Sequence, residues 1–199
     1  MKNEYQYIDP DFAYTDPKTG MLRNKANIGK ADLLIAFESL KVMNRLDELE
    51  IHPIKIKDSL TLLAVHKYLF QDIYDWAGES RTVEISKGGK QFFPLSHFSK
   101  AFYYIDTLIS EYRQTDKNDK QQLASKLADI LDTVNFLHPF REGNGRTQRE
   151  FLRLLAIEKN LTIRLNPPDN ADVYERYMSG TINGDVQKLS KLIFELIEE

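Results

Sequence analysis

Apolar residues between positions 120 and 138 recur every three or four residues, and this stripe constrains the fold more than any other feature of the sequence. Its members are Leu123, Leu127, Ile130, Leu131, Val134 and Leu137. A period of 3.6 residues places them on one face of a helix, and that face must be buried against other elements. We therefore expect a half-buried helix that ends at His138-Pro139.

Similar periodicity predicts further helices along most of the chain. Their expected ranges are 30–50, 57–76, 97–112, a helix beginning at Arg146, 171–178 and 186–197. Asn166-Pro167-Pro168 is a helix breaker that separates the helix beginning at Arg146 from the last two helices. Thr82 to Ile85 alternates with period two, Gly88-Gly89 supplies a turn, and an extended run resumes at Gln91. The sequence therefore predicts an all-α fold with one β-hairpin.

Length and composition narrow the class of protein. The chain has 199 residues, which suits a single domain over residues 31–199, with the turn-rich residues 1–30 as an extended arm packed on it. The net charge of −3 gives no whole-chain case for direct binding to nucleic acid. There is no cysteine and no apolar run of about 18 residues. We expect a cytoplasmic protein without a membrane segment.

The segment from His138 to Arg149 lies between two predicted helices and is the candidate site. Gly143 and Gly145 allow a tight turn that exposes successive backbone N–H groups, which together form a nest for an anion. The N-terminus of the following helix adds its positive end. The pattern predicts a phosphate cradle.

Two arginines strengthen that prediction. Arg146 and Arg149 are expected in the first helical turn, where a cation opposes the helix dipole at a cost of about 0.3–1 kcal/mol. Three residues apart, they share a face and can grip a polyphosphate with two guanidinium forks. Their placement makes sense if an anion binds there.

Glu142 and His138 supply the remaining chemistry. A carboxylate beside phosphates is suited to hold Mg²⁺, which takes only one or two protein oxygens. An imidazole is suited to act as a general base near neutral pH. No nucleophilic Ser or Cys motif accompanies them, so activation of an external hydroxyl is favoured. Each feature alone is usually structural, and Phe140, Trp76 and the scattered His52, His66 and His97 are interpreted as structural.

These residues resemble the signature of the Fic family: a histidine, a phenylalanine, an acidic residue, Gly-Asn-Gly-Arg and a second arginine. The resemblance extends to Ile73–Glu79 with Arg81, to the hairpin, and to the arm from Tyr14 to Asn27, and covers roughly residues 8–198. It implies a mostly helical enzyme that transfers AMP from ATP to a hydroxyl of a target protein and releases pyrophosphate.

The resemblance also assigns roles to individual residues. His138 would accept the proton of the attacking hydroxyl, and Glu142 would hold Mg²⁺. Gly143, Asn144 and Gly145 would hold the α-phosphate, Arg146 the β-phosphate and Arg149 the γ-phosphate. The hairpin would be a flap that pairs main chain to main chain with the target. The flap residues are Thr82, Val83, Glu84, Ile85, Ser86, Lys87, Gly88 and Gly89.

Members of this family are inhibited by a helix that carries Ser or Thr, three residues, Glu, and then Gly or Asn. Ser80 to Glu84 and Thr107 to Glu111 have the spacing, but Ile85 and Tyr112 follow them. The resemblance therefore implies a separate antitoxin chain that holds a toxic enzyme in check. By analogy, type II topoisomerase subunits are the expected targets.

Other functions stay open at this point. The same fold could perform another phosphate-transfer chemistry, such as phosphorylation, phosphocholine transfer or removal of AMP. A non-catalytic module could use the flap to hold a partner, although His138 and Glu142 argue against it.

Overall fold

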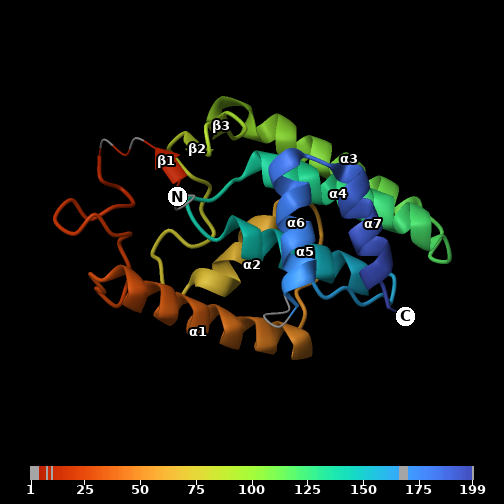
Figure 1. Ribbon diagram of the computed structural model, residues 1–199, viewed down its shortest axis with the longest axis horizontal. Coiled ribbons are helices and arrows are strands. Elements are labelled where there is room, and N and C mark those ends of the chain that lie inside the picture. Colours follow the sequence, from red (N-terminus) through yellow and green to blue (C-terminus); the bar gives the residue numbers. More distant parts are fainter. Residues whose placement is uncertain (1–4, 8, 10, 166–169, 199) are drawn as a thin grey trace.

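The computed structural model describes residues 5–7, 9, 11–165 and 170–198 (Figure 1). Its helices are α1 (Ala31–Ile51), α2 (Thr61–Phe70), α3 (Phe98–Gln114), α4 (Lys120–Leu137), α5 (Asn144–Ile157), α6 (Ala171–Asn183) and α7 (Val186–Leu196). The short 3-10 helix η1 (Leu95–His97) leads into α3. The strands are β1 (Tyr5–Tyr7), β2 (Ile85–Lys87) and β3 (Lys90–Gln91). The predicted helical fold with a hairpin is confirmed.

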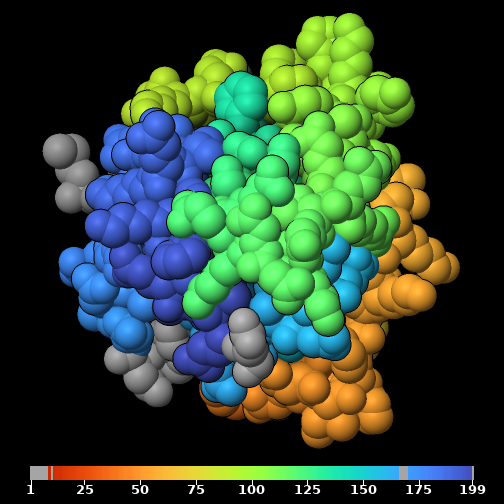
Figure 2. All heavy atoms as spheres, turned by 90° about the vertical axis from the view of Figure 1, so that its right-hand side faces the viewer, coloured from red at the N-terminus to blue at the C-terminus, as the bar shows by residue number. Residues whose placement is uncertain are grey.

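The core lies around α4 and α5. The apolar stripe of α4 is buried, and the helix packs against α3, α5 and α7. On the other side α5 packs against α2, and α2 packs against α1, so the helices follow one another across the molecule in Figure 1. Figure 2 shows the end of the molecule where the loop between α3 and α4 lies beside the C-terminal helices. Each fully buried Leu, Ile or Phe contributes about 1.5–3 kcal/mol to this packing.

The hairpin belongs to a three-stranded antiparallel sheet with the order β1-β2-β3. Gly88 and Gly89 have φ of +58° and +78°, the left-handed conformation that a tight hairpin turn needs. Tyr7 pairs with Ile85 and Tyr5 pairs with Lys87, so β1 adds a strand that the sequence analysis did not predict.

The N-terminal arm contacts the helices and the hairpin at several points. Tyr14 is buried, and its ring meets the edge of Trp76 at 5.5 Å. Its hydroxyl accepts a hydrogen bond from the backbone N–H of Thr82 at 3.0 Å. Farther along, Lys25 N donates to the carbonyl of Ile73 at 2.8 Å. These contacts attach the arm to residues 73–82, the segment between α2 and the hairpin strands.

Three predicted boundaries were wrong. The helix expected over 57–76 is only Thr61–Phe70, and the residues after it form turns, in which Ile73 N donates to the carbonyl three residues back, that of Phe70. The helix expected to end at 178 continues to Asn183, since Gly180 packs against Leu189 of α7 instead of ending it. α5 begins at Asn144 instead of residue 146. The breaker at 166–168 lies outside the described residues.

Candidate active site

The candidate site is the loop that joins α4 to α5. His138 caps α4 with φ of +46°, and Gly143 caps the start of α5 with φ of +82°. A Cβ at position 143 would lie 2.3 Å from Cζ of Phe70, so the loop needs glycine for both its conformation and its space. Gly143 O accepts hydrogen bonds from both N and Oγ1 of Thr147, at 3.0 Å each, which fixes the first turn of α5.

Asn144 holds the loop closed. Its Nδ2 donates to Phe140 O at 2.7 Å, and its Oδ1 accepts from Phe140 N at 2.9 Å. The side chain is buried and both of its polar atoms are engaged within the loop. A phosphate contact of Asn144 stays a prediction and would have to use the main chain.

His66 supports the loop from α2 and was interpreted as structural. Gly78 N donates to its Nδ1 at 2.8 Å, so the proton lies on Nε2, which donates to Glu142 O at 3.1 Å. Its ring stacks on Phe140 at 3.8 Å. Burial lowers the pKa of His66 to about 3, which keeps the ring neutral. Only the fold brings it to the loop, since 76 residues separate His66 from Glu142.

His138 has the tautomer that a general base requires. Its Nδ1 lies 3.0 Å from Asn135 O, and because a carbonyl can only accept, Nδ1 carries the proton and Nε2 the lone pair. The ring stacks on Phe92 of the hairpin at 3.7 Å. Burial lowers the pKa of His138 to about 3, with smaller contributions from the charges of Lys87 and Arg81. The imidazole is therefore neutral near pH 7.

Arg81 joins the hairpin to the loop. Its Nε donates to His138 O at 2.9 Å, and its backbone N–H donates to Pro139 O at 2.7 Å. The two terminal nitrogens donate to Val83 O at 2.7 Å and Phe93 O at 2.6 Å, at the two ends of the hairpin. The sequence placed Arg81 only within the family resemblance, and nothing in its spacing predicted this role.

Arg146 faces two carboxylates. Its Nη2 forms an ion pair with Oε1 of Glu38 from α1 and lies 3.6 Å from Oε1 of Glu142. Its guanidinium lies over the ring of Phe70, 4.9 Å from the centroid. Burial raises the pKa of Glu142, and the nearby Glu38 charge raises it further. Glu38 was not singled out in the sequence.

Arg149 lies one turn farther along α5 than predicted. Because the helix begins at Asn144, Arg146 remains in the first turn while Arg149 falls in the second, where the helix dipole opposes it less. Its guanidinium lies 5.0 Å from the ring centroid of Tyr177 of α6. A Cβ on Gly145 would come within 3.3 Å of Arg149 Nη1, so this glycine leaves room for the arginine. The predicted cradle residues thus lie together around the start of α5.

A magnesium site at Glu142 has one protein carboxylate to offer. Among the described residues, no group of three His, Asp or Glu side chains is arranged to hold a metal ion by itself. The Glu142 side chain is 28% exposed, and Oε1 accepts from Gly143 N at 2.8 Å. Such a site fits a cation that takes its other ligands from a nucleotide and from water.

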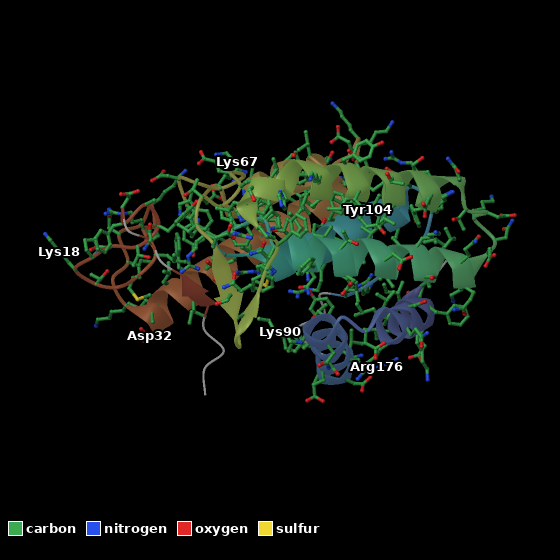
Figure 3. All side chains as sticks on the ribbon, turned by 90° about the horizontal axis from the view of Figure 1, so that it is seen from above. Lys18, Asp32, Lys67, Lys90, Tyr104 and Arg176 are labelled. Atoms are coloured by element: carbon green, nitrogen blue, oxygen red, sulfur yellow. The ribbon has the colours of Figure 1, made fainter. Side chains whose placement is uncertain are left out.

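The hairpin lies over His138, but its outer edge is covered. β1 pairs with the edge of β2 that faces away from β3. On the other side, Phe93 N donates to Phe136 O at 3.0 Å, and Lys90 Nζ donates to Ile182 O at 2.9 Å at the end of α6 (Figure 3). An incoming strand that pairs with β2 would therefore need the place that β1 takes.

No helix in the described part of the chain combines the length and apolar character needed to span a bilayer.

A hollow of about 510 Å³ between α4 and α7 lies at the opposite end of α4 from His138. Its lining, which includes Asp119, Ser125, Lys191 and Phe194, has no histidine.

Comparisons with known proteins identify a family and several relatives of the chain. The model of the Fic/DOC family matches residues 58–156. The chain is 31% identical over 193 residues to a Sinorhizobium fredii protein named Probable protein adenylyltransferase, covering 95% of this chain and 98% of the relative. It is 28% identical over 188 residues to the Escherichia coli protein named Probable protein adenylyltransferase Fic, covering 94% and 92%.

A solved structure supports the fold. The crystal structure of the BepC effector of Bartonella tribocorum with bound AMPPNP superposes with a TM-score of 0.81 at 20% identity, covering 94% of this chain and 97% of that chain. The complete motif lies on the loop after α4 and the start of α5, and one relative is 31% identical over nearly the full length of both chains, so the chain belongs to the Fic/DOC family.

Proposed function

We propose that this chain is a protein adenylyltransferase, which transfers AMP from ATP to a Ser, Thr or Tyr hydroxyl of a target protein and releases pyrophosphate. The observation that carries the proposal is a neutral, buried His138 whose Nδ1 proton is held by Asn135 O. It lies a few residues before an anion cradle that carries two arginines. The names of the full-length relatives support the same activity.

His138 accepts the proton of the attacking hydroxyl at Nε2. The Asn135 carbonyl fixes the tautomer, and Phe92 and Arg81 fix the ring and the backbone on either side. Positioning the base in this way contributes about 10²–10⁴-fold to the rate. The proton passes from the hydroxyl to Nε2 as the new bond to phosphorus forms.

The start of α5 binds the triphosphate. Backbone N–H groups at the start of α5, from Asn144 onward, face the α-phosphate, and Arg146 and Arg149 hold the β- and γ-phosphates. Glu142 would hold Mg²⁺, which supplies positive charge to neutralise the phosphates when bound. The residues stabilise the charge that moves to pyrophosphate as the bond between the α- and β-phosphates breaks.

Target recognition uses the hairpin, residues 82–93. The target presents an extended segment that pairs with the outer edge of β2, where β1 now lies. Main-chain pairing sets the register of the hydroxyl relative to His138 and leaves the side chains of the target free to vary. We place the reaction in the cytoplasm, with type II topoisomerase subunits as the targets to test first.

A separate antitoxin completes the proposal. The chain lacks the inhibitory sequence, so the enzyme is active unless a small partner supplies the inhibitory helix. Expression without that partner would then be toxic, and toxicity would require His138.

The test incubates the protein with Mg²⁺, ATP labelled on the α-phosphate and a bacterial lysate. We expect a labelled protein band that is lost in His138→Ala and kept in His52→Ala, which changes an exposed histidine away from the loop. Transfer of label only from the γ-phosphate would mean kinase chemistry. If neither label is transferred by a protein that binds ATP, the proposal is wrong for this chain.

A further inference from the structure

We propose that Glu38 and Tyr74 are positioning residues for nucleotide binding, which act by fixing the guanidinium of Arg146 toward the phosphates. The inference rests on the proposed function, because it concerns the same nucleotide. Neither residue belongs to the loop motif. Glu38 comes from α1 and is separated from Arg146 by 108 residues.

The contacts form a chain from the core to the cradle. Tyr74 donates its hydroxyl proton to Oε2 of Glu38, while Oε1 of Glu38 accepts from Nη2 of Arg146. Tyr74 is 1% exposed, and its ring stacks on Trp76 at 4.3 Å. The carboxylate is therefore held from behind by a side chain that cannot move without disturbing the core.

The burial of this pair is hard to explain by stability alone. The side chains of Glu38 and Arg146 are only 12% and 24% exposed. Desolvating two charges offsets most of what their attraction contributes, and apolar residues of similar size would stabilise the fold as well or better. In addition, Arg146 lies in the first turn of α5, where the helix dipole disfavours a cation. A carboxylate that fixes this arginine is better explained by what the arginine binds.

The geometry leaves donors for a ligand. A guanidinium has five N–H donors in a planar fork, and Glu38 engages it through Nη2. Phe70 covers one face of the same group at 4.9 Å. One edge contact and one face contact fix the plane of the fork, so little side-chain freedom is lost when a phosphate binds.

The same contacts argue against Glu38 as a competitor of the phosphate. A competing carboxylate would have to leave Arg146 when the nucleotide arrives. Both Glu38 oxygens are engaged, and the side chain is largely enclosed, so departure would leave a buried charge without its cation. Positioning and competition predict opposite changes in ATP affinity when Glu38 is altered.

The chain contains a matched control on the same helix. Glu48 of α1 accepts from Arg45 Nη1 and from the Tyr68 hydroxyl, at 2.8 Å each. Arg45 lies over the ring of Tyr68 at 5.3 Å. This second Arg–Glu–Tyr group is away from the loop and its glutamate is 48% exposed. Arg45 also pairs with Asp72 at 2.8 Å, and the group has the same Arg–Glu and Glu–Tyr contacts at a place where no nucleotide is proposed.

The experiment compares Glu38→Gln and Tyr74→Phe with Glu48→Gln and Tyr68→Phe in the full chain. Binding of Mg²⁺-AMPPNP and of AMP is measured by calorimetry, and the KM for ATP and kcat of AMP transfer are measured separately. We expect Glu38→Gln to weaken AMPPNP binding and raise the KM for ATP by about tenfold, the lower end for loss of a supporting residue. AMP binding and the control variants should stay near the wild type.

A double-variant cycle tests whether Glu38 acts through Arg146. In an Arg146→Ala background, Glu38→Gln should cause no further loss of AMPPNP affinity. Equal losses of AMPPNP affinity in the wild-type and Arg146→Ala backgrounds would overturn the proposal. Tighter AMPPNP binding in Glu38→Gln would also overturn it, and so would a loss of AMP affinity as large as the loss of AMPPNP affinity. If Glu38→Gln fails to fold, Tyr74→Phe keeps the carboxylate and carries the same comparison. Because AMPPNP binding needs no transfer, an absence of AMP transfer in the wild type would reject the proposed function separately.

Discussion

The segment at residues 138–149, which comprises the loop and the start of α5, and the hairpin at residues 82–93 both contain glycine with a positive φ, but their surroundings differ. In the loop, a Cβ on Gly143 would lie 2.3 Å from Cζ of Phe70. The Asn144 side chain forms hydrogen bonds with both the N–H and the carbonyl of Phe140. In the hairpin, nothing lies within 4 Å of a Cβ on Gly89. The loop is fixed by packing and the hairpin turn is not.

This difference matches two kinds of task. Groups that carry out chemistry must be held in place before the substrate arrives, and the buried loop provides that. A hairpin that pairs through its main chain with a target tolerates changes at its turn. We expect substitutions to separate the two regions accordingly.

The largest effect should come from Gly143→Ala. The added methyl group would overlap the Phe70 ring, and alanine would have to adopt a φ that disfavours it. Together these effects should destabilise the fold by about 2–4 kcal/mol and abolish AMP transfer. Gly89→Ala, at nearly the same φ, should cost only about 1 kcal/mol of backbone strain. Urea unfolding and transfer assays compare the two. Equal losses of stability would show that the loop is no more rigid than the turn.

The next effect should come from Arg81→Lys, because Arg81 is the link between the regions. Lysine cannot reach His138 O, Val83 O and Phe93 O together, so buried carbonyls lose their donors. We expect a loss of about 1.5–3 kcal/mol in unfolding free energy and a lower kcat with ATP binding retained. Exposed Arg23→Lys, in the arm, serves as control. Unchanged kcat in Arg81→Lys would mean that hairpin and loop are independent.

Much of this architecture could be predicted from the sequence. Helical periodicity gave α1, α3, α4 and α7 within a few residues, and Gly88-Gly89 gave the hairpin turn. The density of polar groups after His138 gave the loop. These signals are local, so neighbouring residues alone carry them.

The remaining features depend on contacts between distant residues. The Glu38 to Arg146 ion pair and the β1 to β2 pairing join segments far apart, and no spacing in the sequence indicates them. The apolar pattern after Phe70 continues past the end of α2, because Tyr74 and Trp76 enter the core from turns instead of a helix. Periodicity reports burial and cannot separate these cases.

A smaller effect links the regions through pH. The pKa of His138 is lowered to about 3 in the folded protein, so between pH 6.5 and 3 the unfolded chain binds a proton that the folded chain does not. This residue's stabilising contribution is therefore full above pH 6.5 and is lost as the pH falls, by about 1.4 kcal/mol per unit. His66 acts with the same sign. Unfolding by urea from pH 7 to 5 should show a shallower slope in His138→Ala.

The hairpin should account for part of that shift. Phe92 stacks on His138 at 3.7 Å, so Phe92→Ala should expose the ring and raise its pKa toward the ordinary value near 6.5. Proton NMR of the imidazole through the same pH range would measure this directly. If the His138 signal titrates identically in wild type and Phe92→Ala, its burial comes from the helices alone.

The smallest change in stability should follow removal of residues 1–7. The arm keeps its contacts through Tyr14 and Lys25, so the unfolding free energy should change by less than about 1 kcal/mol. The outer edge of β2 then becomes available, and target labelling at low target concentration should increase several-fold while the KM for ATP stays unchanged. A chain with Gly-Ser-Gly at positions 5–7 retains the length and should fall between the two. A decrease in labelling would instead mean that β1 supports the hairpin in the conformation that the target needs, so that the target would have to bind elsewhere on it.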